Sequence, residues 1–126
     1  MIFDTDVLIW FMRGKPEAAK AVASVPKESR FISVISYLEL VQGIRDKAEL
    51  KLLKETLPEI GLAILPLSKN IGQRACELMD SFKLSSGLEV QDALIAATAA
   101  ACQDTLYTGN LKHFKDLSIS VKAFSV

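Results

Sequence analysis

Carboxylate side chains stand beside apolar segments at several places along the chain, and they are the residues best suited to chemistry. Asp4, Glu39 and Asp92 are the main candidates. Gathered at one site, three carboxylates would repel one another and raise one another's pKa, and a bound divalent cation would remove that conflict. Oxygen ligands without Cys or an obvious His favour Mg²⁺ or Mn²⁺ over Zn²⁺. Such a site suits phosphoryl chemistry, in which the ion polarises the phosphate and lowers the pKa of an attacking water.

Asp4 and Asp6 follow the apolar pair Ile2-Phe3 at the start of the chain. An acid at the carboxyl end of a strand lies in the ligand crevice of an open α/β sheet, and the apolar flanks of Asp4 argue against a freely solvated side chain. Asp6 has two interpretations. Its side chain caps the next helix, or it contacts the residues of the site and orients them.

Glu39 and Asp92 are expected near the starts of two helices. Glu39 lies in the apolar segment 36–41, where a lone buried carboxylate is costly, and helix geometry directs it back toward the crevice. Asp92 begins the most apolar helix, where the helix dipole alone would also favour an acid. Ser36 is expected to support the site or to position substrate.

Thr108-Gly109-Asn110 follows another predicted strand. Gly and Asn are ordinary turn residues, so a plain turn is one interpretation. The functional one is a polar pair facing the crevice, with Thr108 in support and Asn110 orienting a water or a ligand.

Short apolar runs alternate with helical patterns along the whole chain. This alternation predicts an α/β fold with right-handed crossovers and a parallel sheet covered on both faces, in a single domain over residues 1–126. One helix should end before Pro58, and the aperiodic segment 83–90 should be a mobile loop bordering the crevice. The predicted strands are 2–3, 30–34, 63–65, 105–107 and 120–124, and the predicted helices are 6–12, 16–25, 36–45, 48–57, a helix capped by Ser68, and 91–101.

The composition excludes several classes of protein. Fifteen basic and fifteen acidic residues balance, so net charge does not indicate a nucleic-acid partner and any basic surface must be local. No apolar run approaches a membrane span. The first predicted strand, residues 2–3, begins directly after Met1, which leaves no room for a signal peptide. Cys76 and Cys102 are expected to be buried, reduced thiols, and both features are expected of a cytoplasmic protein.

Motifs for other hydrolases and nucleotide-binding proteins are absent. One histidine excludes a two-histidine acid–base mechanism, and His113 is expected to be a surface or packing residue. There is no nucleophile elbow, no Gly-x-x-x-x-Gly-Lys loop and no Gly-x-Gly-x-x-Gly turn.

Four segments, in order and spanning the chain, resemble the PIN-domain family, and more narrowly the VapC toxins of type II toxin–antitoxin systems. They are 3–9, 33–43 with Glu39, 91–99 with Asp92, and 106–114. The resemblance implies a five-stranded parallel sheet of order 3-2-1-4-5 in an α/β/α sandwich. It also implies a Mg²⁺- or Mn²⁺-dependent endoribonuclease, usually a homodimer inhibited by a VapB-type antitoxin, that leaves a 5′-phosphate and a 3′-hydroxyl.

Carried over by position, the catalytic acids and metal ligands are Asp4, Glu39 and Asp92. The family often has two further acids where this chain has Asn110 and Val90, and both departures weigh against a second metal ion more than against the first. Glu89 is a candidate substitute, and helix phase does not decide whether it compensates. The resemblance also implies that the antitoxin's C-terminal segment lies in a groove and offers a basic residue to the acids. Its apolar contacts would be Ile9, Trp10, Phe11 and helix 48–57.

RNA would need local cations, and several basic residues flank the predicted crevice loops. They are Arg13, Lys15, Arg45, Lys47, Lys112 and Lys115. Contact with RNA and an ordinary solvated surface are equally good interpretations of these residues.

Three other functions are compatible with part of the pattern. Asp4-Thr5-Asp6 imitates the opening of aspartate-nucleophile phosphatases, but the chain is short for them and lacks a late Gly-Asp pair. A phospho-receiver domain needs an acid after the third strand, where residues 65–68 have none. A PIN-like binding module with weak or lost catalysis stays open because of Asn110, although the three retained acids argue against it.

Overall fold

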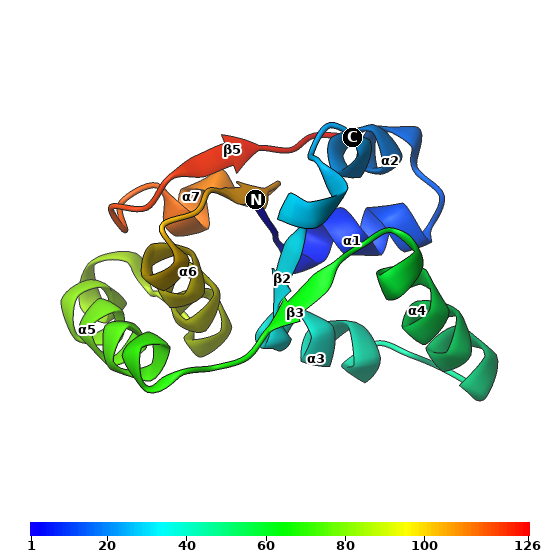
Figure 1. The fold of residues 1–126 in the computed structure, drawn as a ribbon. Coiled ribbons are helices and arrows are strands. Elements are labelled where there is room, and N and C mark those ends of the chain that lie inside the picture. Colours follow the sequence, from blue (N-terminus) through cyan, green and yellow to red (C-terminus); the bar gives the residue numbers. More distant parts are fainter.

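A parallel sheet of five strands forms the centre of the computed structural model, which describes all residues 1–126. The strands lie in the order β3-β2-β1-β4-β5, and every neighbouring pair is parallel (Figure 1). The predicted order is confirmed. The strands are β1 Ile2–Phe3, β2 Phe31–Ser33, β3 Ala63–Leu65, β4 Leu106–Thr108 and β5 Val121–Ala123.

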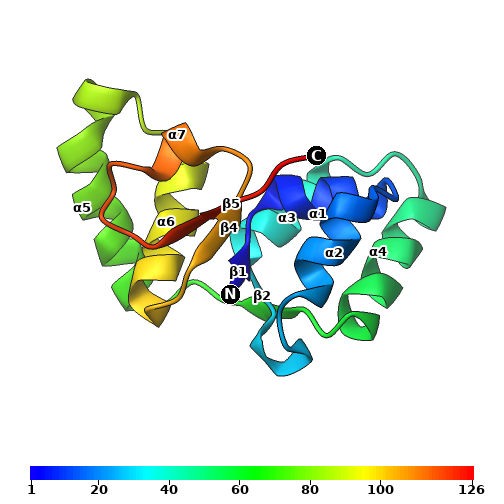
Figure 2. The same ribbon diagram turned by 90° about the horizontal axis from the view of Figure 1, so that it is seen from above.

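Helices cover both faces of this sheet, as Figure 2 shows from above. Helices α1, α2 and α4 lie on one side, and α5, α6 and α7 lie on the other. The helices are α1 Thr5–Met12, α2 Pro16–Ala23, α3 Val34–Gln42, α4 Lys47–Glu59, α5 Lys69–Ser86, α6 Val90–Cys102 and α7 Leu111–Phe114, with a short 3₁₀ turn at Lys27–Ser29.

The two residues of strand β1 pack on opposite faces of the sheet. Ile2 and Phe3 are both fully buried, but Ile2 packs with α5, α6 and α7 whereas Phe3 packs with α1, α2 and α4. Successive side chains of a strand point to opposite faces, so a strand covered on both sides is apolar at every position. The burial of β1 fixes the position of Asp4, the next residue.

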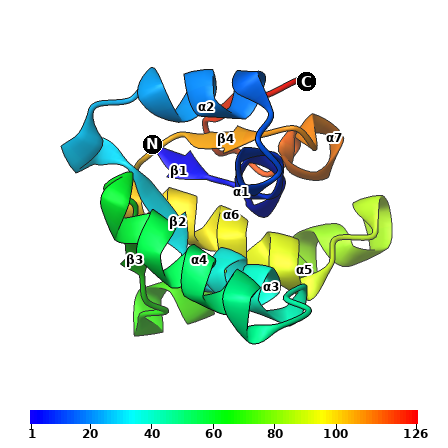
Figure 3. The same ribbon diagram turned by 90° about the vertical axis from the view of Figure 1, so that its right-hand side faces the viewer.

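The order of the strands creates a crevice beside β1. From β1 the chain runs outward to β2 and β3, and helices α5 and α6 then return it to β4 on the other side of β1 (Figure 3). Where the strand order reverses in this way, the helices diverge at the carboxyl ends of the strands and leave space for a ligand. Asp4 follows β1, whereas Ser33 and Thr108 are the last residues of β2 and β4, so all three lie at strand ends beside the crevice.

Several predicted helix ends are wrong. The helix predicted over residues 36–45 is α3 Val34–Gln42, and the helix predicted over 16–25 ends at Ala23. Helix α4 continues through Pro58 to Glu59, because a proline in the last turn forfeits one hydrogen bond without preventing the Ile60 N–H from bonding to the Thr56 carbonyl. Helix α5 continues to Ser86, so residues 83–86 of the predicted loop are helical, and Gly87 ends the helix with a positive φ of 66°. Leu84 in that turn is 99% exposed, so no burial pattern marked the turn as helical.

The predicted burial of the two cysteines is also wrong. Cys76 and Cys102 are both free and exposed, because each lies on the outward side of its helix. No helix has the length and apolarity needed to cross a bilayer.

A candidate active site lined by carboxylates

A polar cavity of about 300 Å³ brings the predicted acids together at the crevice. Ile9 is its one hydrophobic residue, so the lining provides oxygen ligands and hydrogen-bonding groups rather than an apolar surface. The lining residues are Asp4, Thr5, Asp6, Ile9, Glu39, Glu89, Gln91, Asp92, Asn110 and His113.

Asp4 is buried at the base of this cavity. It is the N-cap of α1, where its Oδ1 accepts a 2.8 Å hydrogen bond from the Thr5 N–H. Its Oδ2 accepts a 2.7 Å bond from the Thr108 hydroxyl, itself fully buried at the end of β4. Burial raises the pKa of Asp4 in spite of both hydrogen bonds, which act to lower it.

Glu39 reaches the cavity from α3 and is held by α1. Its Oε1 accepts a 2.9 Å hydrogen bond from the Thr5 hydroxyl, which is also hydrogen-bonded, at 3.0 Å, to the buried Ser36 hydroxyl. Burial raises the pKa of Glu39, the Thr5 hydrogen bond lowers it, and the charges of Asp4 and Asp92 raise it further. Ser36 therefore lies next to Glu39 through the shared Thr5 hydroxyl.

Asp92 lies in the first turn of α6 and is held by α7. Its Oδ2 is 3.1 Å from His113 Nδ1. Burial raises the pKa of Asp92, His113 lowers it, and the charges of Asp4 and Glu89 raise it.

Asp6 accepts hydrogen bonds both from the turn after β4 and from the first turn of α1, whose N-cap is Asp4. Its Oδ2 accepts a 2.9 Å hydrogen bond from the Gly109 N–H and a longer one, 3.4 Å, from the Asn110 side chain, while its Oδ1 binds the Val7 N–H. A Cβ on residue 109 would lie 2.5 Å from Asp6 Oδ2, so only glycine permits this approach. Burial, together with the charge of Asp4, raises the pKa of Asp6 to about 6.

All four acids thus have a raised pKa, which means that the cavity disfavours their negative charges. No group of three Asp, Glu, His or Cys side chains converges tightly enough to form a ready-made metal cluster. Glu39 and Asp92 nevertheless each keep one carboxylate oxygen without a protein donor, and each oxygen of Asp4 accepts one bond and has a second lone pair. This donor set has the oxygen ligands that a hard divalent cation prefers, and Asp4, Glu39 and Asp92 are the residues that would hold it.

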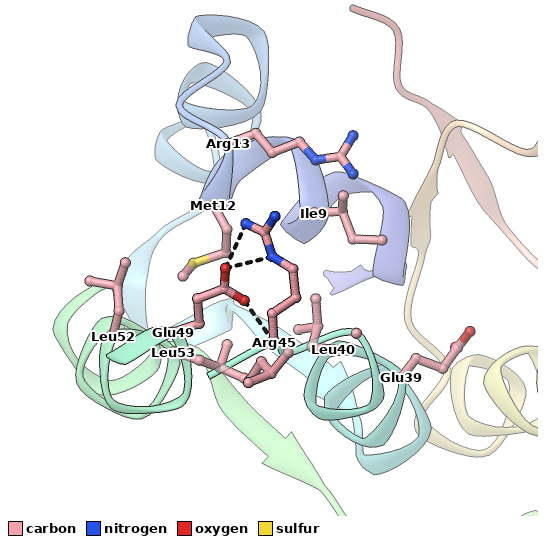
Figure 4. Close-up of a pocket in the computed structure, with 11 residues that line it drawn as sticks. Ile9, Met12, Arg13, Glu39, Leu40, Arg45, Glu49, Leu52 and Leu53 are labelled. Carbon is pink, nitrogen blue, oxygen red and sulfur yellow. Dashed lines mark hydrogen bonds and ion pairs between the residues drawn. The ribbon is translucent and has the colours of Figure 1, made fainter. Parts of the chain in front are cut away.

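A larger hollow of about 610 Å³ adjoins the cavity and shares Ile9 and Glu39 with it (Figure 4). Helices α1, α3 and α4 form its walls. Across it Arg45 binds Glu49 through its backbone N–H, its Nε and an Nη–Oε1 contact of 2.6 Å. The remaining lining residues are Met12, Arg13, Leu40, Gly43, Ile44, Leu52 and Leu53. We call this hollow the α1–α4 groove.

The basic residues expected at the crevice lie around it rather than in it. Arg13 and Arg45 line the α1–α4 groove, and Arg45 is paired with Glu49. Arg13 and Lys15 lie over the Trp10 ring, at 5.3 and 5.6 Å from its centroid. Lys112 is exposed on α7.

Thr5 and His113 are site residues that the sequence reasoning missed. Thr5 stands between two acids, and a hydroxyl in that position was a usable signal. His113 was expected to be a surface or packing residue, and its side chain is indeed 52% exposed, but it also lines the cavity and contacts Asp92. Nothing in the local sequence relates residue 113 to residue 92.

Solved structures with this fold include a toxin–antitoxin complex from Klebsiella pneumoniae, which is 27% identical over 99% of this chain and 98% of that chain, with a TM-score of 0.83. VapBC2 from Rickettsia felis, bound to a promoter DNA fragment, is 22% identical over 99% and 100%, with a TM-score of 0.81. VapBC-1 from nontypeable Haemophilus influenzae is 22% identical over 98% of each chain, with a TM-score of 0.81. No curated protein matches the sequence.

The family comparison covers the same residues that build the sheet and the cavity. The PIN-domain model matches residues 1–118, which contain β1 to β4 and every residue that lines the cavity. The predicted resemblance is therefore confirmed, and the chain belongs to the PIN-domain family.

Proposed function

We propose that this protein is a Mg²⁺- or Mn²⁺-dependent endoribonuclease and acts as the toxin of a VapBC-type toxin–antitoxin module. The observation that carries the proposal is the meeting of Asp4, Glu39 and Asp92 around one polar cavity, each held by a donor from another element. The Klebsiella pneumoniae structure described as a toxin–antitoxin complex supports the biological role.

The three acids would hold one divalent cation, which would neutralise their mutual repulsion, polarise a phosphate and make a water more acidic. The chain's own residues orient the reactants. Thr108 and Thr5 keep Asp4 and Glu39 in place, and Asn110, on the rim, positions the water or a phosphate oxygen. Water adds to the phosphorus as the bond to the 3′ oxygen breaks, so one product carries a 5′-phosphate and the other a 3′-hydroxyl.

The two departures from the family pattern favour one cation over two. Val90 is 60% exposed and supplies no ligand, and Asn110 contributes an amide instead of a charge. Glu89 does line the cavity, although its side chain makes no cap hydrogen bond to α6. It is a further acid at the mouth of the site.

The α1–α4 groove would receive the C-terminal segment of a VapB-type antitoxin. Six of its eleven lining residues are hydrophobic, its Arg45–Glu49 pair is satisfied internally, and Glu39 joins the groove to the cavity. A basic residue of the antitoxin could therefore reach the acids while apolar residues fill the groove. Trp10 and Phe11 do not line the groove and Leu53 is buried in the core, so Ile9 and Leu52 are the proposed contacts.

RNA and a second copy of the chain complete the proposal. Arg13, Lys15 and Lys112 would contact RNA phosphates around the cavity, and exposed Leu84 and Val90 are apolar surface available to a homodimer. Sedimentation equilibrium of the free protein tests the dimer.

The deciding experiment is cleavage of an end-labelled pool of structured RNAs by the protein purified free of antitoxin. It is run with Mg²⁺, with Mn²⁺ and with EDTA, beside Asp4→Asn and Asp92→Asn. We expect metal-dependent cleavage that both variants lose. Cleavage that survives in the variants would indicate a contaminating nuclease. No cleavage by folded protein in either metal, with Mn²⁺ binding intact, would favour the binding module that Asn110 leaves open.

A further inference from the structure

His113 is the only histidine of the chain, and it crosses from α7 to an acid of another element. Its Nδ1 lies 3.1 Å from Asp92 Oδ2 on α6. We propose that His113 is a positioning residue for Asp92: it holds one carboxylate oxygen so that the other stays directed at the cation. This inference rests on the proposed function, because it assigns His113 a role toward the cation that Asp92 would bind.

The backbone that carries His113 is fixed at both ends. Before it, the Asn110 N–H donates to the Thr108 hydroxyl at 3.0 Å, and the His113 N–H donates to the Asn110 carbonyl at 3.0 Å. After it, Phe114 is fully buried among the residues that cover the α5–α7 face of the sheet. The imidazole is therefore presented from a rigid support, although α7 is only four residues long.

Packing does not explain why a histidine stands at this position. The side chain is 52% exposed, and it lines the cavity with the acids rather than filling the core. Its one contact with an acid is to Asp92. The contact with Asp92 therefore explains the histidine at this position better than core packing does.

Asp92 needs an external support more than the other two acids do. Asp4 is held by two protein donors and Glu39 by the Thr5 hydroxyl. Asp92 has only His113, and the negative charges of Asp4 and Glu89 both act on it. Without the Nδ1–H donor, the half-buried carboxylate would be free to rotate away from these charges toward solvent. A carboxylate that adopts several rotamers loses entropy when it binds a cation, and the affinity falls accordingly.

Two amide variants test whether the donor must lie at the place of Nδ1 or whether any polar side chain at residue 113 is enough. In His113→Asn the amide nitrogen takes nearly the place of Nδ1, whereas in His113→Gln the donor is one methylene further out. Asp116→Asn, exposed in the segment after α7, is the matched control. Binding of Mn²⁺ is measured first, without RNA, by electron paramagnetic resonance of the free ion. The kcat and KM for RNA cleavage are then measured at saturating Mn²⁺ and below saturation.

We expect His113→Gln to weaken Mn²⁺ binding about 10- to 100-fold, the usual effect of losing the support of a metal ligand. His113→Asn and Asp116→Asn should bind Mn²⁺ nearly as well as wild type. In His113→Gln, kcat should recover largely at saturating Mn²⁺, and the thermal midpoint in EDTA should stay close to that of wild type.

Unchanged Mn²⁺ affinity in His113→Gln, or equal losses in the Asn and Gln variants, would overturn the positioning role. A loss of kcat that persists at saturating Mn²⁺ would overturn it too and would indicate direct contact of His113 with RNA. If wild type binds Mn²⁺ but cuts no RNA, the proposed ribonuclease fails while the binding comparison still decides the role of His113.

Discussion

The hydroxyl of Thr108 donates a 2.7 Å hydrogen bond to Oδ2 of Asp4, and it thereby joins the carboxyl ends of the neighbouring parallel strands β4 and β1. Both side chains are buried, and 104 residues separate them in sequence. The same pattern recurs at the other two acids, because Thr5 holds Glu39 and His113 contacts Asp92. Each acid of the proposed site is thus oriented by a residue of another element.

Removing the Thr108 hydroxyl should destabilise the fold and disturb the site. In Thr108→Val the shape is nearly kept, but Asp4 Oδ2 is left buried without its donor. We expect the free energy of unfolding to fall by about 1–3 kcal/mol. Thr108→Ser keeps the hydroxyl and serves as the control. Urea denaturation at pH 7 measures both, and a Val variant as stable as wild type would show that the hydrogen bond has no net value.

A methyl group at residue 109 should be tolerated poorly, because its Cβ would lie 2.5 Å from Asp6 Oδ2 and 3.4 Å from the Phe124 carbonyl oxygen. Gly109→Ala should therefore cost about 1–3 kcal/mol of stability, as overpacking usually does. Gly43→Ala is the control, since its nearest atoms lie at ordinary distances of 3.7 and 3.8 Å. Adding Asp6→Ala should recover part of the loss at residue 109. Strict additivity of the two substitutions would contradict this contact.

Stability should depend on pH through Asp6, whose pKa is raised from 3.8 to about 6 by burial and by the charge of Asp4. Between these values the folded protein binds a proton that the unfolded chain has released, so the free energy of unfolding falls as pH rises. Asp4, Glu39 and Asp92 act in the same direction.

Asp6→Asn cannot ionise, so its stability should decline less than that of wild type between pH 4 and 7. Asp80→Asn, on the exposed side of α5, should decline as wild type does. Urea denaturation without divalent cations at several pH values measures the slopes. An Asp6→Asn slope as steep as that of wild type would show that other groups cause the dependence.

Divalent cations should stabilise wild type at pH 7, because a bound cation would offset the mutual repulsion of the acids of the cavity. A cation that binds only the folded protein contributes about 2.7 kcal/mol at 100 times its Kd. Asp92→Asn should be at least as stable as wild type in EDTA, because a repelling charge is gone, and should gain little from Mg²⁺ or Mn²⁺. Thermal denaturation with and without the ions is the measurement. An equal gain in both proteins would place the bound cation elsewhere.

Substitutions of Leu52 and Leu53 on α4 should affect different properties, antitoxin affinity and stability respectively. Leu53 is 3% exposed, so Leu53→Ala should cost about 2–5 kcal/mol of stability. Leu52 is 54% exposed at the α1–α4 groove, so Leu52→Lys should leave stability and RNA cleavage unchanged. The same variant should weaken binding of the cognate antitoxin, measured by titration calorimetry. Antitoxin affinity unaffected by Leu52→Lys would place the antitoxin outside the groove.

Much of the fold could be predicted because the residues that an element buries are apolar and recur at the period of a helix or a strand. The apolar pair Ile2-Phe3 predicted β1 and placed Asp4 at its carboxyl end, and the alternation of elements predicted the parallel sheet. Elements that are exposed to solvent could not be predicted in this way. Residues 83–86 are helical without any core contact that a periodic pattern could record, and helix periodicity did not reveal that both cysteines face outward.

The sequence by itself determined which acids could meet, because strand ends and helix starts fix where a side chain emerges. Only the tertiary structure decided what holds them. The partners of Asp4, Glu39 and Asp92 are 104, 34 and 21 residues away, the last being the difference between positions 113 and 92. Such contacts depend on how the helices pack across the sheet, and local propensity carries no information about them. The crevice acids were therefore predictable, whereas the contacts of Thr5 with Glu39 and of His113 with Asp92 were not.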